Sequence, residues 1–188
     1  TGVYSIIFGS GGEDEGGSLW RVPLTDLMNN DISGATMLID DPVTGFIAPA
    51  SIADINYDGV YDIVSQSFSG SIHAIDGLMD TILWKVTIPG SQSSAAPIFG
   101  NFTGNQSPDV FAVLGKGSAP SYFDYYQVMI NGSTGQVEFF DSISDLHFAS
   151  ANAVDLDLNG RDEVILSLNY HTGTHFEHQL KIVDFPNN

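Results

Sequence analysis

The sequence predicts an all-β protein built from one repeated unit, and three observations lead to this. Apolar runs such as 63–64 and 164–166 are short, rich in β-branched residues and bounded by turn residues. Helical periodicity is nearly absent from the 188 residues. A repeat of about fifty residues runs along the whole chain, which is typical of a β-propeller. We therefore expect a propeller of four-stranded antiparallel blades.

Each repeat contains a loop motif, and the last residue of this motif, its closing residue, stands just before a predicted apolar strand. The closing residues are Ser5, Asp62, Asp109 and Glu163, so successive copies are offset by 57, 47 and 54 residues. The copies predict blade repeats over four approximate ranges: 1–47, 48–94, 95–148 and 149–188.

Each complete unit is expected to contain four strands. In the second unit these are an Ala-rich entry strand over 49–55, a strand over 61–66 after the loop, a third over 71–76 and a fourth over 81–88. Segment 24–30 is the one expected short helix, because Thr and Asp stand at its start.

The number of strands sets an expectation about ring closure. The chain holds about three and a half blades, whereas closed propellers have about four to eight. We expect further polypeptide to complete the ring. A four-bladed ring sealed by its two partial blades is the alternative.

Composition limits the classes of partner. Five basic residues against 23 acidic ones give a net charge of −18, which argues against nucleic acid or anionic lipid as a partner. The absence of cysteine excludes a disulfide framework and a thiolate metal site. No apolar run is long enough to be a transmembrane segment, so no membrane insertion is expected.

Two loops, 54–62 and 155–163, carry the pattern of a calcium site. Oxygen-bearing side chains stand at alternate positions, a glycine allows a sharp turn, and a carboxylate closes the loop. Carboxylates this close repel one another without a cation. The loop at 101–109 keeps one carboxylate, Asp109, and contains Pro108, so we expect it to be empty or weak.

Segments 53–64 and 154–165 resemble the FG-GAP/VCBS repeats of integrin α-subunit propellers and bacterial surface proteins. Segments 74–77 and 82–84 also look like part of a quinoprotein-type propeller repeat. The first resemblance implies two Ca²⁺ sites. Their ligands would be the side chains of Asp54, Asn56, Asp58 and Asp62 with the Val60 carbonyl, and those of Asp155, Asp157, Asn159 and Glu163 with the Arg161 carbonyl.

Loops between the second and third strands of each unit share one rim with the loops that join successive units, and a ligand face is expected there. One long loop of the first kind spans 10–17. Two others, 115–126 and 169–178, are also long and unusual. The loop at 115–126 adds to the ligand face, because exposed aromatics on a rigid scaffold are good anchors, although they can also pack over their own blade. The loop at 169–178 holds three histidines whose spacing suits zinc only on a helix. The residues are Tyr122, Phe123, Tyr125 and Tyr126 in the first of these two loops, and His171, His175 and His178 in the second.

These observations favour a calcium-stabilised extracellular or cell-surface propeller that acts as a non-catalytic adhesion or interaction module. The expected partners are a protein or glycan ligand, or further blades or subunits. One alternative is a structural subunit of a larger surface assembly. The other is the propeller domain of a quinoprotein or a polysaccharide-active enzyme, although the sequence singles out no catalytic residues.

Overall fold

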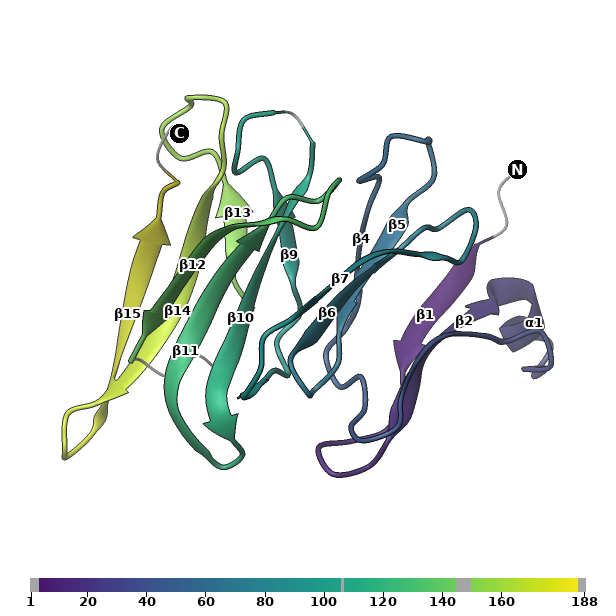
Figure 1. Cartoon of the computed structure of the whole chain (residues 1–188), viewed down its shortest axis with the longest axis horizontal. Helices are drawn as coiled ribbons and strands as arrows, with labels where there is room; N and C mark the ends of the chain where they lie inside the picture. Colours follow the sequence, from purple (N-terminus) through teal and green to yellow (C-terminus); the bar gives the residue numbers. More distant parts are fainter. Residues whose placement is uncertain (1–3, 106, 145–149, 186–188) are drawn as a thin grey trace.

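The computed structural model describes residues 4–105, 107–144 and 150–185. Within them the chain forms four antiparallel sheets that follow one another in chain order (Figure 1). Residues 1–3 and Ala149, which belong to the predicted repeats, lie outside the described residues. No helix in the described ranges is long and apolar enough to cross a membrane.

The first sheet joins β1 (Ser5–Gly9), β2 (Gly17–Pro23) and β3 (Thr36–Asp41), and α1 (Leu24–Met28) lies against β2. The second joins β4 (Ser51–Ala53), β5 (Asp62–Gln66), β6 (Ser71–Ile75) and β7 (Ile82–Thr87). The third joins β8 (Ser91–Gln92), β9 (Ile98–Gly100), β10 (Asp109–Ser118), β11 (Ser121–Ile130) and β12 (Val137–Ile143). The fourth joins β13 (Asn152–Val154), β14 (Glu163–His171) and β15 (Phe176–Val183).

The second sheet has the predicted four strands in the order β4-β5-β6-β7. The all-β prediction and the short helix are confirmed. The third sheet differs, because β8 adds a strand that pairs with β10 at Gly115 and Lys116. Among the described residues the first and fourth sheets have three strands each.

Neighbouring sheets pack face to face, and an apolar core fills each of the three interfaces. Leu19 and Ile39 of the first sheet pack with Ile63 and Ile75 of the second. Because β5 and β6 lie between two sheets, every one of their residues is buried. Burial on both faces explains why such strands read as continuous apolar runs rather than alternating ones.

The core between the third and fourth sheets is aromatic at one end. Phe102 is fully buried, and its ring centroid lies 6.2 Å from that of Phe111 and 5.2 Å from that of Phe185. Phe111 comes from β10 and Phe185 follows β15, so this cluster joins segments far apart in the chain.

Polar contacts also join the sheets, and one close backbone approach lies within the second sheet. Arg21 of β2 pairs with Asp80, and its Nη1 donates a hydrogen bond to the Gly77 carbonyl at 3.2 Å. A Cβ atom on Gly77 would lie 1.9 Å from the Tyr61 carbonyl oxygen, so no other residue fits there. In the next interface, the Trp84 indole donates to a backbone carbonyl of the β11–β12 turn at 2.6 Å.

One buried histidine lies between the first two sheets. His73 of β6 is 4% exposed, and its ring centroid lies 6.0 Å from that of Phe46. Burial, with a smaller contribution from the charge of Lys85, lowers the His73 pKa to about 4, and the charge of Asp41 opposes this shift. The native state therefore holds His73 in its neutral form at neutral pH.

We predict that Phe102→Ala lowers the free energy of unfolding by roughly 3–5 kcal/mol, because the lost ring leaves a cavity that touches two other rings. Urea unfolding followed by tryptophan fluorescence measures this loss. Phe123→Ala is the matched control, since Phe123 is 62% exposed. Equal losses in the two variants would contradict the position of Phe102 in the core.

We predict that His73 destabilises the fold in weak acid. Its pKa is depressed in the folded state, so its contribution to stability is present above pH 6.5 and is lost as the pH falls toward 4. From pH 7 to pH 5 the wild type should lose about 2 kcal/mol more than His73→Gln. The exposed His175→Gln should behave as the wild type, and parallel losses in all three proteins would refute the prediction.

Candidate metal centre

The loop between β4 and β5 and the loop between β13 and β14 fold into the same turn. Tyr57 and Leu158 adopt φ angles of 62° and 61°, and Gly59 and Gly160 both adopt 88°. Residues other than glycine rarely adopt positive φ angles. Two glycines at matching positions with the same positive φ angle therefore indicate one shared loop geometry. Both loops lie at the same end of their sheets (Figure 1).

The first carboxylate of each loop accepts a hydrogen bond from the backbone amide of the glycine in the turn. The Gly59 amide donates to Asp54 Oδ2 at 3.0 Å, and the Gly160 amide donates to Asp155 Oδ2 at 2.9 Å. The Asn159 amide also donates to Asp155 Oδ1 at 3.0 Å. These bonds fix the directions of both carboxylates.

The closing carboxylates are held in the same way. Asp62 Oδ2 accepts from the Ile55 amide at 3.0 Å, and Glu163 Oε2 accepts from the Leu156 amide at 2.7 Å. Asp62 is fully buried and Glu163 is 5% exposed. Buried carboxylates are costly unless they are hydrogen-bonded or paired with a cation, and these backbone amides offset part of that cost in both loops.

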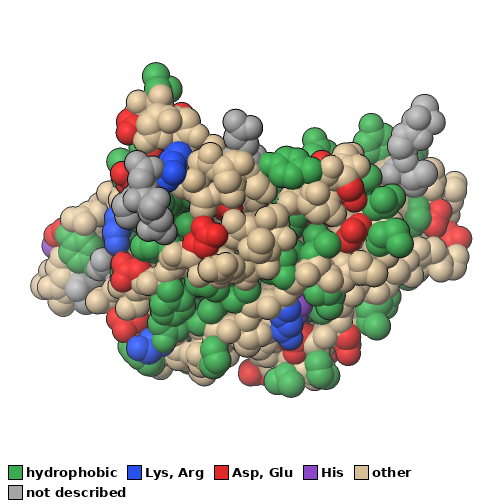
Figure 2. All heavy atoms as spheres, turned by 45° about the horizontal axis from the view of Figure 1, so that its top comes forward, with side chains coloured by type: hydrophobic (Ala, Val, Ile, Leu, Met, Phe, Trp, Pro, Cys, Tyr) green, Lys and Arg blue, Asp and Glu red, His purple; other side chains and the backbone are tan. Residues whose placement is uncertain are grey.

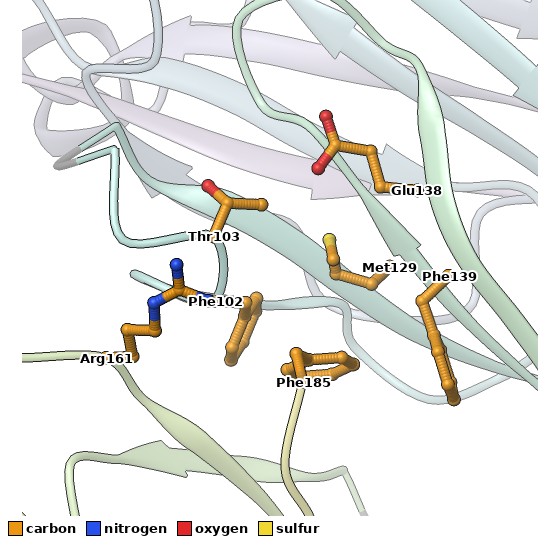
Figure 3. A pocket seen from close by; sticks show the side chains of 7 residues that line it. All are labelled: Phe102, Thr103, Met129, Glu138, Phe139, Arg161 and Phe185. Carbon is orange, nitrogen blue, oxygen red and sulfur yellow. The ribbon is translucent and has the colours of Figure 1, made fainter. Parts of the chain in front are cut away.

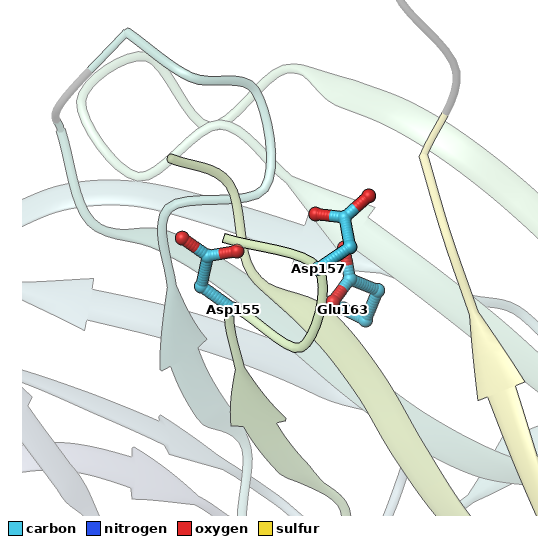
Figure 4. A group of neighbouring side chains, drawn as sticks. All are labelled: Asp155, Asp157 and Glu163. Carbon is cyan, nitrogen blue, oxygen red and sulfur yellow. The ribbon is translucent and has the colours of Figure 1, made fainter. Parts of the chain in front are cut away.

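In the last loop the structure brings three acids together. Ligand oxygens of Asp155, Asp157 and Glu163 all lie within 4.8 Å of one another, which is a spacing that can hold a metal ion (Figure 4). Without a cation these carboxylates repel one another. The structure thus brings together three of the predicted ligand side chains as an acidic triad, and their role as metal ligands stays a prediction.

In the first loop the corresponding positions are Asp54, Asn56 and Asp62, so an amide replaces one carboxylate. Asp54 Oδ1 is buried and has no hydrogen-bond partner in the described structure. A buried oxygen of this kind is what a bound cation satisfies, and the donor set of two carboxylates and one amide fits a hard ion.

Two predicted ligands cap the backbone of their own turns. Asp58 Oδ1 accepts from the Val60 amide at 2.7 Å, and Asn159 Oδ1 accepts from the Arg161 amide at 2.8 Å. These side chains lie outside the acidic triad, and their role as ligands stays a prediction. The same holds for the carbonyls of Val60 and Arg161.

The loop at 101–109 keeps the turn with a different chemistry. Gly104, at the position of Tyr57, has a φ angle of 73°. The Thr103 amide and hydroxyl both donate to Asp109 Oδ2, at 2.9 and 2.7 Å. Asn101 Nδ2 donates to a carbonyl of the last loop at 2.7 Å. Hydroxyl and amide groups thus replace carboxylates here, in line with the predicted weakness of this site.

Arg161 connects the last loop to the middle one. A Cβ atom on Gly104 would lie 2.6 Å from Arg161 Nε, so the guanidinium lies directly over that turn. Arg161 and Glu138 also line a cavity of about 270 Å³ beside Phe102 and Phe139 (Figure 3). The sequence alone did not predict this cavity, because its lining residues come from loops and strands of two sheets that are far apart in the chain.

A second cavity of about 390 Å³ lies at the opposite rim, where hairpins of three successive sheets converge. Its lining includes Glu13 from the β1–β2 hairpin, Phe68 from the β5–β6 turn and Tyr122 from β11. The Tyr122 hydroxyl donates to Gln92 Oε1 at 3.1 Å. Burial raises the Tyr122 pKa, with a smaller contribution from the charge of Glu13.

The four residues predicted as a ligand face have different environments. Tyr122 lines the second cavity, and Phe123 is 62% exposed. Tyr125 is 7% exposed within the core between the third and fourth sheets. Tyr126 stacks at 5.0 Å on Phe140. Tyr122 and Tyr125, which both line the second cavity, and the exposed Phe123 therefore remain the candidates for ligand contact.

Two segments expected as loops are hairpins instead. β10 continues to Ser118 and β11 begins at Ser121, and β14 continues to His171 with β15 beginning at Phe176. Cross-strand pairing extends these strands, since aromatic side chains pair well on a sheet. The expected loops at 115–126 and 169–178 were wrong for this reason.

Among the residues that the structure describes, the histidines do not belong to a cluster of side chains that could hold a metal ion. His178 Nδ1 bonds to Asn169 across the hairpin, and His175 Nε2 lies 3.4 Å from Glu177 Oε1. The side chain of His171 lies outside the described part.

No family model and no curated protein matches the sequence. Among solved structures, the chain is similar to a europium-containing methanol dehydrogenase, with 12% identity and a TM-score of 0.48, over 76% of this chain and 23% of that one. The chain thus spans under a quarter of that protein's length.

Proposed function

We propose that this chain is a calcium-stabilised, extracellular, non-catalytic binding module whose sheets are the blades of a β-propeller. The acidic triad of Asp155, Asp157 and Glu163 is the observation that carries this proposal. The module would bind its ligand at the rim opposite the metal loops.

Calcium is the ion that best suits the donors in these loops. The side-chain donors are carboxylates and an amide, which hard cations prefer, and neither cysteine nor histidine is near them in the sequence. Sensor and extracellular sites of this kind fill at micromolar to millimolar calcium, so exposure to extracellular calcium would keep them occupied. The resemblance to FG-GAP/VCBS loops points to the same ion.

The metal would have a structural role. Both loops lie inside hairpins, β4–β5 and β13–β14, and the acids are fixed by backbone amides of the same loop. An ion bound there joins the end of one strand to the start of the next. It therefore stabilises the sheet rather than acting on a substrate.

The cavity lined by Glu13, Phe68 and Tyr122 is the candidate ligand site. It combines aromatic rings with polar groups such as Gln92 and Ser93, and no Lys or Arg lines it in the described structure. Aromatic faces and hydrogen-bonding side chains are typical of sites for neutral sugars. Acidic side chains are spread over the surface (Figure 2), which disfavours anionic ligands.

We predict that saturating Ca²⁺ raises the melting temperature of the chelator-treated protein by roughly 5–10 °C, because it binds only the folded state. Asp157→Asn should remove much of this increase by removing a triad carboxylate. It should also leave the calcium-free protein as stable as the wild type or more so, since repulsion is relieved.

Calorimetric scans in chelator, Ca²⁺ and Mg²⁺ at fixed ionic strength measure these effects. Asp14→Asn, which removes an exposed acid outside the loops, is the matched control and should keep the full calcium response. The calcium proposal fails if calcium and magnesium give the same small shift in all three proteins.

We predict binding of neutral oligosaccharides through the second cavity. On an array of neutral and acidic oligosaccharides, the calcium-loaded protein should retain neutral ones, and Tyr122→Ala should weaken binding about tenfold through loss of ring contact. Tyr4→Ala is the matched control, because Tyr4 is 78% exposed and lies outside this cavity. Retention of acidic sugars alone, or equal effects of both variants, would reject the site.

A further inference from the structure

The first cavity, which Arg161 and Glu138 line, lies between the third and fourth sheets on the side of the acidic loops (Figure 3). It is separate from the second cavity, because the two share no lining residue. Its volume of about 270 Å³ is just below the roughly 300–1,000 Å³ that is typical of ligand pockets. A ligand of this cavity is therefore a small molecule.

The apolar part of the lining belongs to the aromatic core. It consists of Phe102, Met129, Phe139 and Phe185. Phe102, Met129 and Phe185 are at most 6% exposed, so packing fixes their positions. The rings of Phe139 and Phe185 meet edge to face with their centroids 5.2 Å apart. Such a lining suits the apolar or aromatic part of a ligand.

The Arg161 guanidinium has neither an ion pair nor a hydrogen-bond acceptor among the described residues. Other cations of the chain do have partners, since Arg21 pairs with Asp80, and Lys116 Nζ lies 3.8 Å from Asp124 Oδ2. A guanidinium carries several N–H donors in a plane, and a carboxylate accepts a parallel pair of them. Arg161 therefore offers the cavity a site for a carboxylate.

The backbone on both sides of Arg161 is fixed by Asn101 of the third sheet. Asn101 Nδ2 donates to the Gly160 carbonyl at 2.7 Å, and the Asn101 amide donates to Asp162 Oδ2 at 2.7 Å. The Asp162 amide donates back to the Asn101 carbonyl at 3.0 Å. Because these contacts hold the loop in place, the binding of a ligand costs little further ordering of the chain.

Glu138 of β12 supplies the opposite charge. Its Oε1 accepts a hydrogen bond from Asn131 Nδ2 at 3.1 Å, and no other described group bonds to this carboxylate. Glu138 and Arg161 line one cavity, but no ion pair joins them in the described part of the chain. A ligand between them can therefore contact both charges.

We propose that the first cavity binds a free α-amino acid with an apolar side chain. The Arg161 guanidinium binds its carboxylate, the Glu138 carboxylate binds its ammonium group, and the aromatic lining holds its side chain. The net charge of −18 disfavours a ligand that carries a carboxylate alone, whereas a zwitterion is neutral overall. Each end of a peptide presents only one of the two charges, so a free amino acid matches the site better.

Isothermal titration calorimetry of the full chain in calcium-containing buffer tests the proposal. L-Leucine and L-phenylalanine should bind. N-Acetyl-L-leucine and L-leucinamide each lack one charge and should bind about tenfold more weakly or not at all. L-Aspartate should also bind weakly, because its charged side chain does not suit the apolar lining.

Arg161→Gln and Glu138→Gln should each weaken the binding of L-phenylalanine by about tenfold or more, since each removes one charged partner. Lys85→Gln is the matched control. It removes an exposed cation outside the cavity and should bind as the wild type does. If Arg161→Gln unfolds by circular dichroism, Arg161→Lys replaces it, because lysine keeps the charge but loses the paired donors.

Absence of binding by both L-leucine and L-phenylalanine overturns the proposal. Binding of the acetyl or amide derivative as tight as that of L-leucine also overturns it, since one of the two charges would then have no role. Wild-type affinity in the Arg161 and Glu138 variants has the same meaning. Oligosaccharide binding at the second cavity and the calcium response of the melting temperature use other measurements, so these results leave the proposed function untouched.

Discussion

Face-to-face packing of consecutive sheets is the constraint on which the rest of the structure depends. It buries β5 and β6 completely and most of β10, which fixes the direction of each central strand. With the strands fixed, the loops at 54–62, 101–109 and 155–163 fall at one rim, and the β1–β2, β10–β11 and β14–β15 hairpins fall at the other (Figure 1). The candidate metal centre and the candidate ligand cavity are separated by the length of a strand for this reason.

The acidic loops show how a local sequence directs a local structure. Gly59 and Gly160 allow the turn, and backbone amides then hold Asp62 and Glu163 at the start of a buried strand. These contacts lie within about nine residues, so the pattern of the loops predicts them well. Calcium would act on a geometry that the chain already forms.

Longer-range features escape such reasoning. Tyr125 and Phe123 are aromatic residues of one segment. A register shift in the β10–β11 pairing leaves Phe123 without a register partner in β10, and Phe123 is exposed whereas Tyr125 is buried in a core. The sequence suggested a loop there, because glycine and proline residues interrupt the pattern at 115–120. Pairing with β11 nevertheless continues β10 through this region, which is an example of tertiary context overriding local signals.

The sequence by itself determined the all-β class, the spacing of the repeats, the four strands of the second sheet and the acids of both loops, because each depends on residues close together in the chain. Tertiary structure alone decided that Arg161 lies over Gly104, and that Glu13, Phe68 and Tyr122 share one cavity. Those relations depend on how separate sheets pack together, and the spacing of residues along one chain does not encode that packing.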